Sequence, residues 1–256
     1  MKKNNAVHLA NVRESGKYLT ELLWILYKQT KAGMRLLDLE DIAEQYMQKH
    51  KLKWAFKGYH GFPCNLCLSV NDCIVHGIPD DYVLKNWDFL KVDCGVIYKW
   101  GITDSAFSIV VWWDHTNPQA AELSKVTKQA LDLAVPEMQA GVSIYNFGKV
   151  VSDYVTSHNF TVIKNLTGHG VWSDVHEEPY IYNYAEPQSR NIRFEENSVV
   201  AVEPITALTS KKSVERAWIA WNLYTVNGDI GAHWEYEIIV GPNGPEIVSG
   251  LVDIKL

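Results

Sequence analysis

The sequence predicts an α+β fold that contains two similar units, and three observations support this interpretation. Shifting the sequence by 108 positions places Gly33 on Gly141 and aligns an apolar stripe of helical spacing after each glycine. A glycine-histidine segment follows each stripe. Runs rich in β-branched and aromatic residues come next. We therefore expect one domain over residues 1–256, with halves at roughly 1–115 and 116–256.

Composition narrows the class of protein. The chain has 24 basic and 30 acidic residues, and this net charge of −6 argues against a DNA-binding protein. No apolar run approaches the roughly 18 residues of a membrane helix, and the N-terminal lysines precede polar residues instead of a secretory apolar stretch. We expect a cytoplasmic protein without membrane contact. Its cysteines should be reduced thiols, at Cys64, Cys67, Cys73 and Cys94.

The first elements of each half should be two helices joined by a turn. Leu23 and Leu26 predict a first helix, the turn glycine Gly33 suits its C-terminal end, and apolar residues from 36 to 50 predict a second helix. The second half repeats this pattern around Gly141. Asp38 and Asn146 stand near the start of the second helices, where short polar side chains accept amide hydrogens.

Four strand-like runs follow, at Leu90–Tyr98, Ile102–Trp113, Val199–Thr206 and Ala232–Val240. Lys99-Trp100-Gly101 predicts a hairpin between the first two. If Tyr98 and Gly101 flank the turn, Gly95 lies opposite Asp104, and Asp93 lies diagonal to Asp104 at about 7–8 Å. Two like charges on one face are unfavourable without a cation. We expect the empty volume beside Gly95 to hold one.

The second half adds three further candidate ligands. Glu203 and Glu235 each interrupt an apolar strand, where an ionised carboxylate is costly without a partner, and His169 lies between two glycines. The predicted donor set therefore contains Asp93, Asp104, His169, Glu203 and Glu235. Two divalent cations would balance its four carboxylates. Oxygen-rich donors with one nitrogen suit Mn²⁺, Fe²⁺, Co²⁺ or Zn²⁺, about 3.5–4 Å apart with a bridging water.

At these residues the sequence resembles the type I methionine aminopeptidases, which are metallopeptidases. The resemblance spans nearly the whole chain. Its motifs are Gly58-Tyr59-His60-Gly61-Phe62-Pro63, His76-Gly77-Ile78-Pro79, the two-aspartate hairpin, Gly168-His169-Gly170, His176-Glu177-Glu178-Pro179, Glu203-Pro204 and Glu235. It implies a pita-bread fold, in which two pseudo-symmetric halves contain a curved, mainly antiparallel sheet covered by helices.

The resemblance also implies a role for each residue. Asp93 would bind one ion, Asp104 and Glu235 would bridge both ions, and His169 and Glu203 would complete the second site. Glu203 would also be the general base. His176 would bind the substrate carbonyl and stabilise its oxyanion, and His76 would contact the scissile nitrogen. The residues of the methionine pocket would be Tyr59, Phe62, Cys67 and Trp221.

Several residues depart from the family pattern. Gly95 stands where many relatives have threonine, His233 where glutamine is usual, Val175 where a bulky aromatic residue is expected, and Phe56 where the residue is smaller. Glu237 shares a face with Glu235 and is therefore the nearest rival ligand, but we assign it a place next to the ligands or on the surface. Cys64 and Cys67 form a single Cys-x-x-Cys pair, which is a weak zinc signal, so we interpret Cys67 as pocket wall.

The implied function is that of a single catalytic domain that removes the N-terminal methionine from nascent peptides with a small second residue, through a metal-bridged hydroxide. The enzyme would be a monomer that meets its substrates at the ribosome.

One alternative is a related Xaa-Pro aminopeptidase or dipeptidase. These enzymes usually have a large additional N-terminal domain before the ligand hairpin, whereas the hairpin here begins by about residue 90. A type II enzyme usually has an insertion between His169 and Glu203, which are separated here by 33 residues. The other alternative is a non-catalytic peptide-binding relative, which would have lost ligands.

Overall fold

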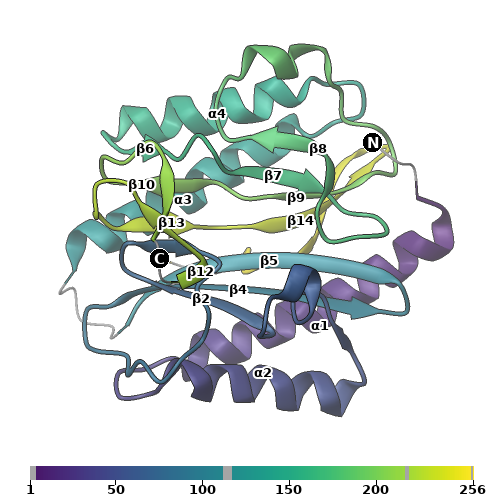
Figure 1. Cartoon of the computed structure of the whole chain (residues 1–256). Helices are drawn as coiled ribbons and strands as arrows, with labels where there is room; N and C mark the ends of the chain where they lie inside the picture. The colour runs from purple at the N-terminus through teal and green to yellow at the C-terminus, as the bar shows by residue number, and fades with distance from the viewer. Residues whose placement is uncertain (1–3, 112–116, 217–218, 255) are drawn as a thin grey trace.

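The computed structural model describes residues 4–111, 117–216, 219–254 and 256, and it contains the predicted pair of helices in each half. Figure 1 shows α1 and α2 below the strands and α4 above them. The helices are α1 (Ala6–Gln29), α2 (Leu36–His50), α3 (Pro118–Ala134) and α4 (Ile144–Ser157), and the 3₁₀ turns are η1 (Tyr59–Gly61), η2 (Val135–Glu137) and η3 (Pro187–Asn191). Within the described residues, no helix is long and apolar enough to cross a membrane.

The helix starts differ in part from the prediction. Asp38 accepts an amide hydrogen as predicted, from the backbone N–H of Arg35 at 2.8 Å, but it is the third residue of α2 and not the residue ahead of the helix. The prediction for Asn146 is wrong, because Ser143 caps α4 by accepting the N–H of Tyr145 at 3.3 Å. Asn146 lies one turn too late for this bond, and its side-chain amide donates to Glu137 instead.

Gly33 does not end its helix either. The C-terminal cap of α1 is Thr30, whose backbone N–H donates to the carbonyl of Leu26 at 2.9 Å. Gly33 lies in the following turn with φ +88°, and Gly141 has φ +85° in the equivalent turn. Both glycines are therefore turn residues, at positions where a side chain would be strained.

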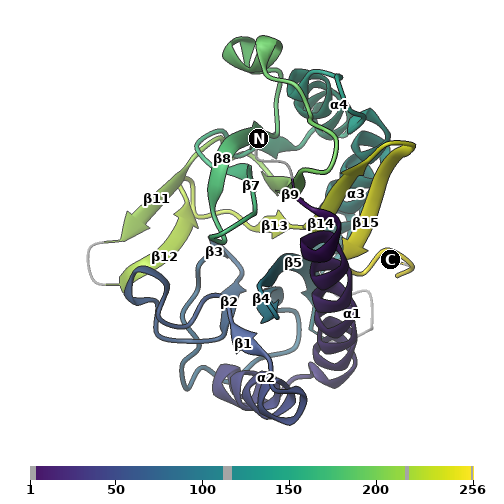
Figure 2. The same ribbon diagram turned by 90° about the vertical axis from the view of Figure 1, so that its right-hand side faces the viewer.

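The described strands pair antiparallel throughout and form four hydrogen-bonded sheets. The first sheet contains β1 (Lys53–Trp54), β2 (Leu66–Val70), β4 (Phe89–Tyr98) and β5 (Gly101–Val110). The largest contains β7 (Thr167–Gly170), β8 (Glu177–Tyr182), β9 (Val199–Val202), β14 (Tyr236–Gly241) and β15 (Gly244–Ser249). The two smaller sheets consist of β6 (Thr161–Val162), β10 (Ile205–Ala207) and β13 (Gly231–His233), and of β3 (Cys73–Val75), β11 (Ser213–Arg216) and β12 (Ile219–Thr225). In Figure 2, β11 and β12 lie on the side of the strands opposite to α1 and α3.

The hairpin has the predicted register. Gly95 pairs with Asp104 and Tyr98 pairs with Gly101. The two turn residues, Lys99 and Trp100, have φ values of 48° and 85°, which match the right-handed twist of the flanking strands. Positions 112 and 113 of the predicted second strand lie outside the described residues.

The two later strands are each divided, so the prediction of continuous strands is wrong. β9 ends at Val202 before Glu203-Pro204, where proline has no amide hydrogen for a ladder. β13 ends at His233, and the N–H of Glu235 donates to the carbonyl of Ala106 on β5 at 3.0 Å. Both glutamates therefore lie in breaks between sheets.

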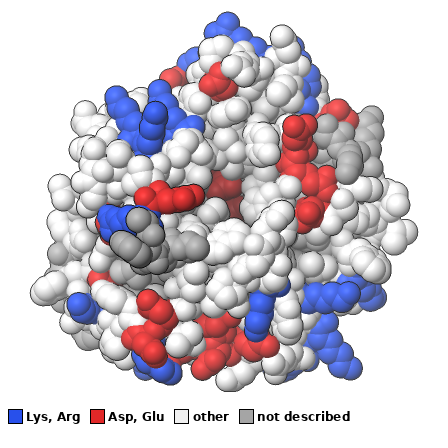
Figure 3. Space-filling model, in the orientation of Figure 1, with Lys and Arg blue, Asp and Glu red and all other residues white. Residues whose placement is uncertain are grey.

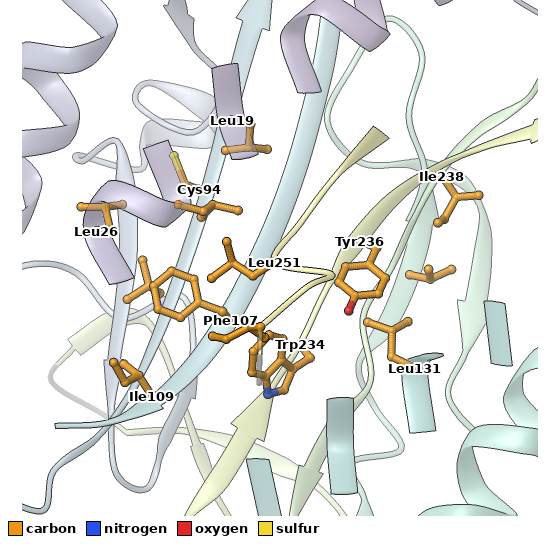
Figure 4. Close-up of a cluster of buried hydrophobic side chains, with 14 of the residues drawn as sticks. Leu19, Leu26, Cys94, Phe107, Ile109, Leu131, Trp234, Tyr236, Ile238 and Leu251 are labelled. Carbon is orange, nitrogen blue, oxygen red and sulfur yellow. The ribbon is translucent and has the colours of Figure 1, made fainter. Parts of the chain in front are cut away.

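One cluster of buried apolar side chains contains residues from both predicted halves. Figure 4 shows Leu19 and Phe107 of the first half in this cluster with Trp234 and Tyr236 of the second. The polar ends of the two aromatic residues are also satisfied. The indole N–H of Trp234 donates to Ser124 at 3.0 Å, and the Tyr236 hydroxyl donates to a carboxylate on α3 at 2.9 Å. The breaks that carry the glutamates are thus anchored in a packed core.

Candidate metal centre

A cavity of about 260 Å³ is lined by residues from both predicted halves of the chain. In Figure 3 the surface is hollowed near its centre, and acidic atoms are visible inside the hollow. All eleven predicted site residues line the cavity: Tyr59, Phe62, Cys67, His76, Asp93, Asp104, His169, His176, Glu203, Trp221 and Glu235. Phe56, Val75 and His233 complete the lining. The structure therefore brings together residues that are as far as 176 positions apart in the chain.

The hairpin and the β13–β14 break supply the first group of donors. Asp93 on β4 and Asp104 on β5 lie on one face because their strands pair in the predicted register. One oxygen each from Asp93, Asp104 and Glu235 lie within 4.8 Å of one another. Such a separation permits one ion to contact all three carboxylates.

A second group shares Glu235 with the first. His169 on β7 pairs with Ala201 of β9, which brings its ring close to Glu203 two residues later. Nε2 of His169 lies 3.6 Å from Oε1 of Glu203 and 3.9 Å from Oε1 of Glu235. Two ligand atoms bound tetrahedrally to one ion at about 2.1 Å are about 3.4 Å apart, so the observed separations are close to those of a metal site.

The electrostatics of the four carboxylates favour a cation. Burial raises the pKa of Asp93 to about 6 and that of Glu203 to about 8. Burial, followed by repulsion from neighbouring carboxylates, raises the pKa values of Asp104 and Glu235 well above their usual range. Among the described residues, no ion pair joins these acids to lysine or arginine. Oδ1 of Asp93 and Oδ1 of Asp104 are buried without a hydrogen-bond partner. The donor set therefore fits divalent metal ions.

Two histidines of the cavity are uncharged at pH 7, and a third packs against one of them. Burial lowers the pKa of His169 to about 3 and that of His76 to about 4, so both rings are neutral at pH 7. Nδ1 of His169 lies 3.3 Å from the carbonyl of Gly170, and a proton shared there leaves Nε2 free to bind a metal. The ring of His176 lies 4.3 Å from that of His169 and is exposed to the cavity mouth.

Aromatic side chains form the other wall of the cavity. Phe62 and Trp221 pack edge to face with their ring centroids 5.5 Å apart. Tyr59 lies 5.3 Å from the ring of His176, and Cys67 pairs with Asp93 across β2 and β4. All four cysteines are free thiols, and the potential metal groups of the described residues contain none of them. An apolar pocket thus adjoins the acidic group.

The space beside Gly95 is filled by protein, so the expectation of a cation there is wrong. A β-carbon on Gly95 would lie 2.8 Å from Cε1 of Phe56 and 2.8 Å from the β-carbon of Ala55. The large residue at position 56 therefore occupies the volume that a side chain at position 95 would need. Val175 is buried in the same apolar cluster as Phe56.

Two further residues approach the donors more closely than the sequence suggested. Glu237 is fully buried, so it is not a surface residue, and its Oε2 accepts the backbone N–H of Asp104 at 3.1 Å. His233 is 2% exposed, and its Nε2 lies 3.3 Å from Oε2 of Glu203. The sequence did contain a signal that His233 lies near the donors: it is two residues from Glu235 in a predicted strand, and residues at this interval share a face.

Comparison with known proteins places the chain among metallopeptidases. The model of metallopeptidase family M24 matches residues 10–242. The methionine aminopeptidase of Mycoplasma capricolum is 34% identical over 96% of both chains, and that of Clostridium perfringens is 31% identical over 97% of this chain and 98% of its own. The structure of methionine aminopeptidase from Thermotoga maritima matches with a TM-score of 0.92 at 29% identity, covering 98% of this chain and 100% of that one. An X-Pro aminopeptidase from the same organism shares the fold, with a TM-score of 0.74 at 18% identity, and 62% of that chain is covered.

Proposed function

Because the chain belongs to metallopeptidase family M24 and has its pita-bread fold, we propose that it is a metal-dependent aminopeptidase that removes N-terminal methionine from peptides. One observation carries this proposal. Five donors of the type that bind divalent metals line a single cavity together with aromatic and sulfur-containing side chains suited to a methionine side chain. The methionine aminopeptidase relatives, matched over nearly their full lengths, support it.

The donors are proposed to hold two divalent ions, chosen from Co, Mn, Fe or Zn. Asp93, Asp104 and Glu235 would hold one ion, and His169, Glu203 and Glu235 with Asp104 would hold the other. When bound, these ions lower the pKa of a water and polarise the substrate carbonyl. Their charge also stabilises the ionised form of carboxylates that burial would otherwise protonate.

The remaining chemistry belongs to side chains of the cavity. Glu203 is proposed to take the proton of the attacking water and to pass it toward the leaving amine. His176, at the cavity mouth, would donate a hydrogen bond to the substrate carbonyl as it becomes an oxyanion. His76 would contact the nitrogen of the bond that breaks. Tyr59, Phe62, Cys67 and Trp221 would enclose the methionine side chain.

We also propose the finer points of the biological role. A small second residue would be required, the substrates would be nascent peptides at the ribosome in the cytoplasm, and the enzyme would act as a monomer. The likeness to the X-Pro aminopeptidase is one of fold and covers 62% of that chain. This favours methionine release over cleavage before proline. A non-catalytic relative would have lost donors, whereas all five are present in the cavity.

The test compares two kinds of peptide. Purified protein supplied with Mn²⁺ or Co²⁺ is offered Met-Ala-Ser and Xaa-Pro peptides, and released amino acids are measured. We expect release of methionine, and its loss with a chelator or in Asp104→Asn. Cleavage confined to Xaa-Pro peptides would support the dipeptidase alternative, and no cleavage with any metal would support the non-catalytic one.

The assigned roles predict two different kinds of defect. Glu235→Ala should lose bound metal, because Glu235 belongs to both donor groups. His176→Ala should keep its metal but lower kcat by about 100-fold or more, as expected when a donor to an oxyanion is removed. Metal content by elemental analysis and turnover of Met-Ala-Ser separate the two. Equal metal loss in both variants would contradict the assignment.

A further inference from the structure

His233 is a buried histidine that the proposed mechanism leaves without a role. Its ring lines the cavity, and both ring nitrogens are buried without a hydrogen-bond partner. Its backbone is held firmly, because Ser108 Oγ accepts the N–H of His233 at 2.9 Å and lies 2.7 Å from its carbonyl oxygen, to which it donates. The ring is therefore directed into the cavity by strand β13.

Two carboxylate oxygens lie close to the ring. Nε2 of His233 lies 3.3 Å from Oε2 of Glu203 and 3.7 Å from Oε2 of Glu235. The other oxygen of each glutamate faces His169, at 3.6 and 3.9 Å. Glu203 thus lies between two imidazoles, with one carboxylate oxygen directed toward each.

The surroundings of the two rings assign them different roles. A neutral imidazole carries one N–H, and its position follows the acceptor that it meets. In His169 the Nδ1 faces the Gly170 carbonyl, so Nε2 is left with a lone pair. Neither ring nitrogen of His233 makes a hydrogen bond in the structure, but Nε2 faces two carboxylate oxygens, at 3.3 Å on Glu203 and 3.7 Å on Glu235. The proton of His233 is therefore favoured on Nε2, where the ring is a donor and not a ligand.

We propose that His233 is a positioning residue, whose Nε2–H donates a hydrogen bond to Oε2 of Glu203 and so directs Oε1 toward the ion and the reacting water. This inference rests on the proposed function, because it concerns the same general base. The hydrogen bond restricts rotation of a carboxylate that lies outside any strand, just after β9. Hydrogen bonds of this kind orient metal ligands, and their loss lowers metal affinity by about 10- to 100-fold.

Two substitutions separate donation from packing. His233→Leu retains apolar volume without a donor, and His233→Gln retains an N–H donor. We expect His233→Leu to lower kcat for Met-Ala-Ser by about 10- to 100-fold with little change in KM, because a misplaced base affects the transition state and not peptide binding. His233→Gln should recover most of the rate. Titration with Mn²⁺ should show the same ranking: the more weakly bound ion should bind less tightly to His233→Leu than to His233→Gln or the unmutated protein.

A matched control is His158→Leu, on the exposed surface after α4. It should change neither kcat nor Mn²⁺ affinity. If His233→Gln is as defective as His233→Leu, the imidazole itself is required and the proposal is wrong. If His233→Leu retains full activity and affinity, the hydrogen bond has no role.

A measurement on the unmutated protein avoids dependence on variant folding. Protein labelled with ¹⁵N-histidine and loaded with Cd²⁺ should show a protonated Nε2 on His233 and cadmium coupling on His169. Cadmium coupling on His233 would make it a ligand and overturn the proposal. The result does not depend on peptide cleavage. If His233 Nε2 is protonated but the protein releases no methionine, the proposed function is wrong and the placement of the His233 proton still holds.

Discussion

Phe56 and Gly95 share one small space beside the cavity, and the size of each residue depends on the other. A β-carbon at position 95 would come within 2.8 Å of the Phe56 ring. The ring is buried and lines the cavity, so it cannot move away without opening a gap in the apolar cluster. The two departures from the family pattern therefore compensate for each other: the larger residue at position 56 fills the volume left by the smaller residue at position 95.

This pairing predicts a coupled response to mutation. Gly95→Thr should destabilise the fold by about 1–3 kcal/mol, because it overfills the space. Combining it with Phe56→Ala should cost at least about 1 kcal/mol less than the sum of the single changes. Urea unfolding of the four proteins measures the coupling.

The control cycle replaces Phe62, which lies in the same cluster but is not among the atoms nearest to a β-carbon at Gly95. Gly95→Thr and Phe62→Ala should be additive within about 0.5 kcal/mol. Additivity in the Phe56 cycle would show that the two residues do not share this space.

The turn between β12 and β13 is held by a charged side chain. Asp229, in the turn between β12 and β13, accepts hydrogen bonds from the backbone and hydroxyl groups of Thr209 and Ser210. Partial burial raises the pKa of Asp229, but these four hydrogen bonds outweigh it and leave the pKa below its usual value. One carboxylate thus joins the turn after β10 to the start of β13.

The sign of this pKa shift sets the expected pH dependence. Because the pKa is lower in the folded state, the ionised group stabilises the fold above its unfolded pKa of about 3.9, and this contribution disappears as the pH falls through the folded pKa. Asp229→Asn should therefore cost about 1 kcal/mol at pH 7 and much less once the pH has fallen below the folded pKa of Asp229. Asp153→Asn, at an exposed ion pair of α4, should change stability by less than about 0.5 kcal/mol at both pH values. A cost for Asp229→Asn that is independent of pH would contradict this account.

At the scale of the whole molecule, the candidate metal ligands come from both predicted halves. Asp93 and Asp104 belong to the first half, and His169, Glu203 and Glu235 belong to the second. A bound ion would therefore link segments that also share one apolar cluster. Metal binding should stabilise the molecule as a unit.

Chelation tests this link. An ion present at about 100 times its Kd adds about 2.7 kcal/mol to the stability of the folded state. For a chain of this size, removing the metal with EDTA should lower Tm by about 5–10 °C, and added Mn²⁺ should restore it. Glu235→Ala should show no response to EDTA. A Tm that is the same with and without metal would rule out a contribution of these ligands to stability.

Much of the fold and of the site follows from local sequence. The two helix pairs are visible as apolar stripes, and the pairing of Gly95 with Asp104 follows from a two-residue turn, since a turn determines register over short range. The residue types predicted the five donors, whereas the other predicted side chains that line the cavity were implied only by the resemblance to methionine aminopeptidases. The internal duplication and the boundaries of the halves stay predictions.

The sequence by itself determined the helix pairs, the hairpin register and the chemistry of the acidic donors, because these depend on neighbours a few residues away. Only the tertiary structure decided that the strands at Glu203 and Glu235 break, that Phe56 fills the space beside Gly95, and that Nε2 of His233 faces Glu203. Each of these depends on contacts between segments far apart in the chain. Close packing and the pairing of buried polar groups determine such contacts, and both arise only when the separate elements meet.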